Sequence, residues 1–78
     1  MMETELHTMN MLFQQLGLPD SDEEVERFIV RHRPLPRGLM IHEASFWKPA
    51  QAKLLKESID LDAEWAEIVD ELDARLRY

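Results

Sequence analysis

Residues 31–51, RHRPLPRGLMIHEASFWKPAQ, hold three of the four prolines in the chain and separate two segments that favour helix. Pro34 has no backbone N–H and its ring clashes with a preceding helical turn, so a helix that approaches it must end near Arg33. Pro49 suits the first position of a helix, where a missing N–H costs nothing. The stretch between these prolines is therefore predicted to be an ordered connector. Its expected apolar anchors are Leu35, Ile41 and Phe46.

Two helices are predicted before the connector. The first lies within residues 7–19, where Thr8 can cap its start and Gly17 can adopt the left-handed conformation that ends a helix. Its apolar residues follow the helical spacing i, i+3, i+4, i+7, and are Met9, Leu12, Phe13 and Leu16. The second lies within residues 19–34 and begins with Ser21-x-x-Glu24, the spacing of a capping box.

Two more helices are predicted after the connector. The third covers residues 48–60 and starts at Pro49, with Gln51 placed to bond back to the N–H of Lys48, or slightly earlier with Ser45 as its cap. The fourth covers residues 60–78, with Asp62 as its cap. Its apolar face comprises Leu61, Trp65, Ile68, Val69, Leu72 and Leu76.

These four segments predict an all-α fold, in which residues 1–78 form a single small four-helix domain. A long, ordered, extended connector joins the second helix to the third. A short strand near residues 39–41 stays open as an alternative within this connector, although no other segment offers it a partner strand.

The charge of the chain is strongly acidic on average and basic in the middle. Sixteen acidic side chains outnumber nine basic ones, which gives a net charge of −7 and opposes indiscriminate attraction to nucleic acid or anionic lipid. Residues 27–56 nevertheless hold seven of the nine bases. Three interpretations stay open, because this basic block can pair internally with the acidic ends, form a surface that binds anions, or consist of charges that are only solvated.

The sequence contains no catalytic or metal-binding pattern. It has no cysteine, which removes disulfides, thiolate metal sites and cysteine nucleophiles. The three histidines are widely spaced, and HEASF begins like the zinc-protease helix H-E-x-x-H but carries Phe46 in place of the second histidine. Glycine-rich phosphate loops and nucleophile motifs are also missing. We therefore expect no enzyme activity, no metal and no cofactor.

Three segments resemble a small bacterial family, the domain of unknown function 2789. They are residues 7–19, residues 28–59 and residues 62–72, and together they cover nearly the whole chain. The family-like residues are His7, His32, Pro34, Leu35, His42, Glu43, Ala44, Phe46, Trp47, Pro49, Ala50, Gln51 and Trp65. Members of the family carry Thr where this chain has Lys48, which puts the cap of the third helix in doubt. The resemblance implies a small soluble protein and assigns no activity.

The function expected from the sequence is that of a non-enzymatic helical interaction module in the cytoplasm. A secretory signal and a membrane-spanning apolar run are both missing, so no membrane contact is expected. The expected partner is a protein, and it can be a second copy of the chain, which would give a homodimer. The alternative is binding of nucleic acid or another polyanion through residues 27–56. The candidate interaction surface comprises Arg33, Arg37, Leu39, Met40, His42, Trp47, Lys48 and Lys53.

Overall fold

The computed structural model describes residues 8–61 and 63–77, and this part of the chain contains helices and no strand. The elements, in chain order, are α1 (Met9–Gln15), α2 (Asp22–His32), the short 3-10 helix η1 (Ile41–Glu43), α3 (Pro49–Leu61) and α4 (Ala63–Leu76). The predicted all-α fold with four helices is thus confirmed. None of these helices is long and apolar enough to cross a lipid bilayer.

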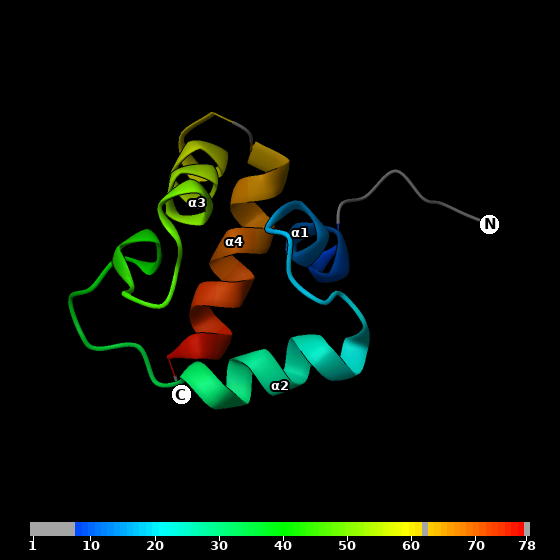
Figure 1. Cartoon of the computed structure of the whole chain (residues 1–78). Helices are drawn as coiled ribbons and strands as arrows, with labels where there is room; N and C mark the ends of the chain where they lie inside the picture. The colour runs from blue at the N-terminus through cyan, green and yellow to red at the C-terminus, as the bar shows by residue number, and fades with distance from the viewer. Residues whose placement is uncertain (1–7, 62, 78) are drawn as a thin grey trace.

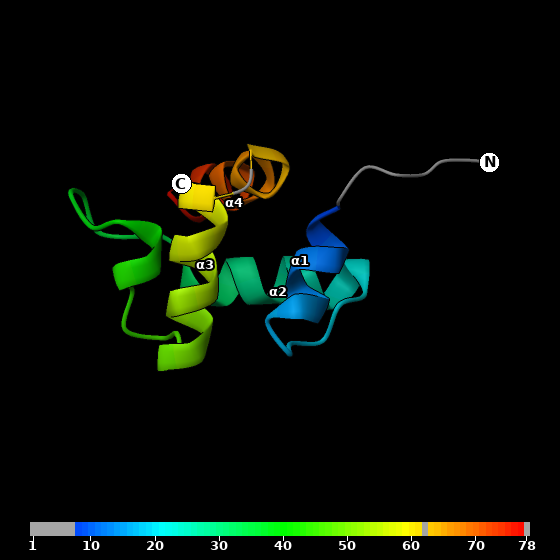
Figure 2. The ribbon, with the colours of Figure 1, turned by 90° about the horizontal axis from the view of Figure 1, so that it is seen from above.

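Helix α4 is the central element, since it packs against α1, α2 and α3 (Figure 1). α4 follows α3 in the chain and runs at a steep angle to it (Figure 1), and α2 crosses the far end of α4. Seen from above, α2 runs below both α1 and α3 (Figure 2). This arrangement leaves one face of α2 turned toward the residues that precede α3.

Both ends of α1 are closed by local hydrogen bonds. The hydroxyl of Thr8 accepts a bond from a backbone N–H of the first turn at 3.1 Å, as a capping residue does. At the other end, the N–H of Gly17 donates to Gln14 (3.0 Å) and that of Leu18 donates to Phe13 (2.9 Å). These two bonds form a Schellman motif, and they require the positive φ of 74° that Gly17 adopts. Both predicted ends of this helix are therefore confirmed.

The ends of α2 also follow the sequence prediction. Ser21 accepts a hydrogen bond from the N–H of Glu24 at 3.2 Å, which is the serine half of the predicted capping box. The helix ends at His32, immediately before the Arg33–Pro34 pair, whose peptide bond is cis. Pro34 thus stops the helix where its missing N–H and its ring predict.

Gln51 connects the start of α3 to the end of α1. Its side-chain oxygen accepts a hydrogen bond from the N–H of Lys48 at 2.9 Å, as predicted, and its amide nitrogen donates to the carbonyl of Leu16 at 2.9 Å. Because α3 begins at Pro49, the alternative of an earlier start capped by Ser45 does not occur. The backbone N–H of Lys48 is therefore bonded by Gln51, although the side chain of Lys48 does not cap the helix.

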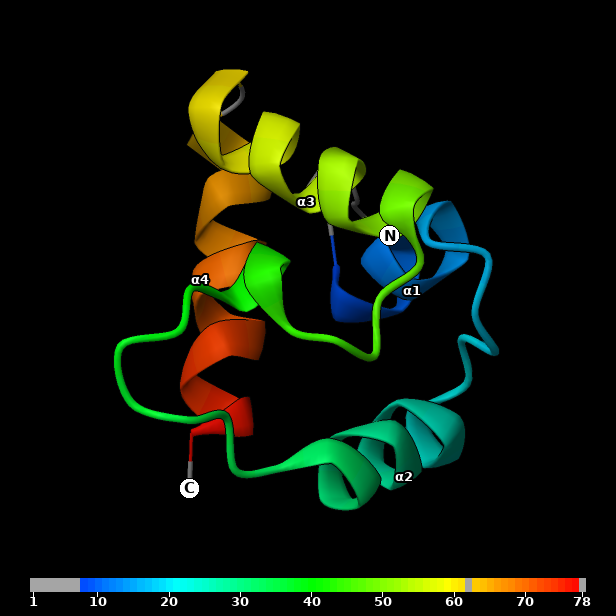
Figure 3. The ribbon, with the colours of Figure 1, turned by 60° about the vertical axis from the view of Figure 1, so that its left-hand side comes forward.

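The connector between α2 and α3 runs along the C-terminal end of α4 (Figure 3). The N–H of Leu35 donates to the carbonyl of Leu76 at 2.7 Å. The guanidinium of Arg77 donates to the carbonyls of Pro36 (3.2 Å) and Leu39 (2.6 Å). These bonds satisfy backbone groups of the connector that lie outside the helices.

The connector is not extended throughout. Residues Pro36–Leu39 form a turn closed by an N–H to carbonyl bond of 3.2 Å, and Gly38 supplies the positive φ of 79°. Ile41–Glu43 then forms η1, so the strand that the sequence left open is not present in the described part of the connector. The 3-10 turn lets the fully buried Ile41 reach the core while Arg37 stays exposed at the tip of the turn.

Buried apolar residues from every element meet in one core. They are Leu12, Phe13, Leu16, Val25, Ile29, Leu35, Ile41, Ala44, Trp47, Leu55, Val69, Leu72 and Leu76. The placement of Leu61 on the apolar face of the fourth helix is wrong, because Leu61 ends α3 and is 81 % exposed. The predicted cap Asp62 lies outside the described residues.

Candidate functional site

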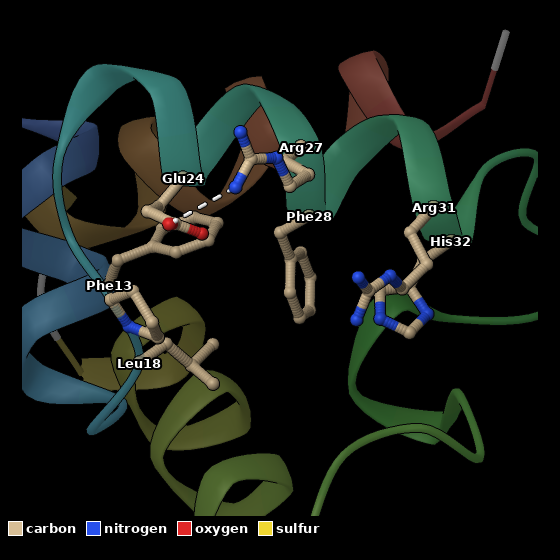
Figure 4. A pocket seen from close by; sticks show the side chains of 8 residues that line it. Phe13, Leu18, Glu24, Arg27, Phe28, Arg31 and His32 are labelled. Carbon is tan, nitrogen blue, oxygen red and sulfur yellow. Dashed lines mark hydrogen bonds and ion pairs between the residues drawn. The ribbon is translucent and has the colours of Figure 1, made fainter.

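A hollow of about 220 Å³ opens between α2 and the turn that links α1 to α2. On the α2 side, Phe28, Arg31 and His32 are spaced i, i+3, i+4 and therefore share one face of the helix (Figure 4). Glu24 and Arg27 border the hollow one turn earlier. The opposite wall comes from Phe13, Leu18 and Pro19. The hollow thus has an apolar interior and a charged edge.

Phe28 is the centre of an aromatic cluster behind the hollow. Its ring lies edge-on to Phe13 at a centroid distance of 5.3 Å and edge-on to Phe46 at 5.7 Å. It also stacks on Trp47 at 5.4 Å. Such pairs contribute about 0.5–1.5 kcal/mol each beyond their burial. Because these rings come from α1, α2 and the connector, the cluster fixes all three relative to one another.

His32 lies between two phenylalanine rings. Its imidazole stacks on Phe46 at a centroid distance of 4.2 Å and is tilted against Phe28 at 4.3 Å. Burial lowers the pKa of His32 below its ordinary value of 6.5, and the positive charge of the neighbouring Arg31 lowers it further. His32 is therefore mainly uncharged at neutral pH and acts there as a flat, weakly polar wall.

The charged edge of the hollow differs between its two ends. At one end, Arg27 forms an ion pair with Glu24 at 3.3 Å. At the other end, Arg31 is exposed and forms no ion pair with any residue of the described part of the chain. An anion that approaches the hollow is therefore attracted to the Arg31 end, whereas the charges of Arg27 and Glu24 offset each other at the other end.

The basic residues fall into two groups. Four of the nine form ion pairs, namely Arg27–Glu24, Lys56–Asp60, Arg75–Glu26 and Arg77–Asp73. The other five are exposed and lack an ion pair within residues 8–61 and 63–77. We call these five the basic surface: Arg31, Arg33, Arg37, Lys48 and Lys53. Internal pairing with the acidic ends therefore accounts for only two of the seven bases within residues 27–56.

Most of the residues predicted to form an interaction surface are accessible. Arg33, Arg37, Lys48 and Lys53 are exposed, and Met40 is 54 % exposed. Leu39 is half-buried and packs against the core. His42 is half-buried as well, and its Nδ1 atom is buried without a hydrogen-bond partner among the described residues.

Trp47 does not lie on the surface, and its inclusion in the predicted interaction surface is wrong. It is only 7 % exposed, and its indole nitrogen donates a hydrogen bond to the carbonyl of Ile41 at 2.8 Å. The physical reason is that this bond and the stacking on Phe28 turn the indole inward. Its neighbour Phe46 is the more exposed of the pair.

The hollow itself was not predicted. From the sequence alone, Arg31 is only one of the seven bases within residues 27–56, and His32 is only one of the family-like residues. The i, i+3, i+4 spacing of Phe28, Arg31 and His32 was the available signal, since it places two rings and a cation side by side. Among residues 8–61 and 63–77, no group of three or more His, Asp or Glu side chains is arranged to hold a metal ion.

The comparisons with known proteins identify a family. The family model described as "Protein of unknown function (DUF2789)" matches residues 2–76, which is nearly the whole chain. No curated protein matches the chain, and neither does any solved structure. The chain therefore belongs to the DUF2789 family of proteins of unknown function.

Proposed function

We propose that this protein is a non-enzymatic interaction module that binds an acidic partner protein through its basic surface. The observation that carries the proposal is the unequal pairing of charges. A chain with a net charge of −7 has ample carboxylates to neutralise nine bases, yet five bases stay exposed and unpaired in the described structure. Exposed cations of this kind steer an oppositely charged partner and fix its orientation.

The packing of the aromatic cluster supports a continuous contact region. The stack of His32 on Phe46 brings the end of α2 next to the residues that precede α3. Arg31 and Arg33 therefore lie close to the segment that ends in Lys48. A partner that covers the cluster therefore meets cations from the end of α2 and from the connector.

The size of the hollow favours binding over catalysis. Sites that enclose small molecules have volumes of about 300–1,000 Å³, and the hollow at α2 measures about 220 Å³. Its histidine, His32, stacks between two rings, where burial lowers its pKa. These features suit a contact surface that a partner covers.

Binding of nucleic acid or another polyanion is the alternative, because the same five cations also attract phosphates. The net charge of −7 opposes a nucleic acid more strongly than an acidic protein segment, because a phosphate backbone carries a denser negative charge. The expected localisation in the cytoplasm remains part of the proposal.

The test is affinity capture with the tagged full chain from a bacterial cytoplasm, followed by titration of each purified candidate. The double variant Arg33→Glu/Arg37→Glu reverses two unpaired cations, and Arg33→Lys/Arg37→Lys is the matched control that keeps their charge. We expect an acidic partner whose affinity falls at least about tenfold in the Glu variant and stays within about twofold in the Lys variant.

Two results would contradict the proposal. One is a partner whose affinity is the same for the natural chain and both variants and does not change with salt concentration, because the basic surface then takes no part in the contact. The other is tight, salt-sensitive binding of mixed DNA or RNA in a gel shift, which would establish the polyanion alternative. Sedimentation equilibrium of the chain alone shows whether the partner is a second copy.

A further inference from the structure

We infer that the hollow at α2 receives one large apolar side chain of an acidic peptide segment, and that Arg31 pairs with a carboxylate next to that side chain. This inference rests on the proposed function. It specifies which side chains the partner presents, namely a large apolar residue and a neighbouring acidic one.

The walls of the hollow favour an apolar occupant. Phe13, Leu18, Pro19 and Phe28 line it with aromatic and aliphatic carbon. A volume of about 220 Å³ is too small for a whole cofactor and large enough for a single side chain such as Phe or Leu. Interfaces draw much of their affinity from a few residues of this type that fill a partner's pocket.

The walls are already fixed without the partner. Phe28 is held by its ring contacts with Phe13, Phe46 and Trp47. Leu18 is held by the N–H to carbonyl bond with Phe13 that completes the Schellman motif. A preformed pocket loses little conformational entropy on binding, so a single side chain can contribute measurable affinity.

The charges at the edge set the direction of the segment. In Figure 4, Glu24 and Arg27 lie on one side of Phe28, and Arg31 and His32 lie on the other. Arg27 is engaged by Glu24, whereas Arg31 is unpaired within the described chain. The acidic residue of the partner is therefore expected beside Arg31, because a carboxylate at the opposite end would meet a pair of charges that offset each other.

Two other hollows of the described structure fit such a segment less well. The one between Met9 and Arg75 is lined by polar groups that already bond to each other, through Arg75–Glu26 and Asn10–Asp22. The cleft beside Leu12 and Leu54 holds only about 110 Å³. Neither offers an unpaired cation next to an apolar wall.

The experiment titrates the ¹⁵N-labelled full chain with synthetic peptides. One peptide has a central Phe flanked by Glu, a second has Ala in place of that Phe, and a third has Lys in place of every Glu. We expect the Phe peptide to shift the amide signals of Leu18, Phe28 and Arg31, and to bind at least about tenfold more tightly than the Ala peptide. The Lys peptide should not bind.

Two variants locate the contact. Leu18→Trp fills the hollow and should reduce the affinity for the Phe peptide to that for the Ala peptide, with circular dichroism confirming that the chain still folds. Arg31→Glu should weaken both acidic peptides strongly. Lys56→Glu makes the same charge change outside both the hollow and the basic surface, at a residue that pairs with Asp60, and it should weaken both peptides only slightly and by equal factors.

The outcomes separate this inference from the proposed function. Equal binding of the Phe and Ala peptides, both weakened by Arg31→Glu, would overturn the apolar pocket and leave the basic surface in place. Acidic peptides that bind no better than the Lys peptide would overturn both. Tighter binding of a single-stranded DNA oligonucleotide, or shifts at Leu18 that depend on protein concentration alone, would also overturn the inference, because the occupant would then be a nucleic acid or a second copy.

Discussion

The amide nitrogen of Gln51 donates a hydrogen bond to the carbonyl of Leu16 at 2.9 Å, although the two residues are 35 positions apart in the chain. The side-chain oxygen of the same residue accepts from the N–H of Lys48. One amide thus satisfies a carbonyl at the end of α1 and an N–H at the start of α3. These are groups that helix ends leave without an internal partner.

Replacement of Gln51 by Ala should therefore destabilise the fold at two helix ends together. We expect the free energy of unfolding to fall by about 1–2 kcal/mol, the range for loss of a cap and of a partly buried hydrogen bond. Urea denaturation followed by circular dichroism measures this change. Gln14→Ala removes an exposed amide from α1 and should change stability by less than about 0.5 kcal/mol. Equal effects of the two variants would contradict the assignment.

Arg77→Ala should release the connector. The guanidinium bonds to the carbonyls of Pro36 and Leu39, and its removal leaves both without that partner. We expect a loss of about 1–2 kcal/mol in stability, together with faster hydrogen exchange of the Leu39 amide.

The control for Arg77 is Arg75→Ala, which removes an ion pair with the exposed side chain of Glu26. Such pairs contribute about 0–1 kcal/mol, so this variant should be milder and should leave exchange in the connector unchanged. Acceleration of exchange at Leu39 by Arg75→Ala would show that general instability, and not the Arg77 bonds, controls the connector.

Trp47→Phe tests the inward orientation of the indole. The variant keeps an aromatic ring but removes the donor to the carbonyl of Ile41, at a site that is 7 % exposed. We expect a loss of about 1–3 kcal/mol, because the buried carbonyl is left without that donor. Thermal unfolding measures the loss. An unchanged melting temperature would mean that Trp47 does not hold η1 in place.

His32 should make stability depend on pH. Its pKa in the folded chain is lowered, by burial first and by Arg31 second, whereas the unfolded chain keeps the ordinary value of 6.5. Protonation therefore favours the unfolded chain. The contribution of neutral His32 is complete above about pH 6.5 and is lost as the pH falls through the lowered pKa.

The measurement is a series of melting temperatures for the natural chain and for His32→Phe, which keeps the stack on Phe46 and cannot titrate. The difference between the two should be constant above about pH 7 and should grow in favour of the variant as the solution is acidified below about pH 6.5. Parallel curves over this range would contradict the role of His32.

The sequence predicted the features that depend on neighbouring residues. Thr8, Ser21 and Pro49 mark helix starts through their own backbone chemistry, and Gly17 marks an end in the same way. Each of these four predictions is confirmed because the interactions involved span no more than a few residues.

The features that the sequence did not predict depend on tertiary contacts. The hollow exists because Phe28 contacts Phe13 and Phe46, and these three residues come from three separate segments. No local sequence pattern predicts these contacts. The burial of Trp47 rather than Phe46 depends on a carbonyl that the unexpected η1 presents. Leu61 fits the apolar spacing of α4 but belongs to α3, and the spacing alone does not reveal this boundary.

The hydrogen bonds between Arg77 and the connector can form only late in the synthesis of the chain. The bonds to Pro36 and Leu39 span 41 and 38 residues, so their acceptors leave the ribosome long before their donor. Closing loops of this length costs entropy that local helix formation does not. Helices α1 and α2 can form as the chain emerges, whereas Arg37 reaches its fixed place at the tip of the turn only after translation of α4 is complete.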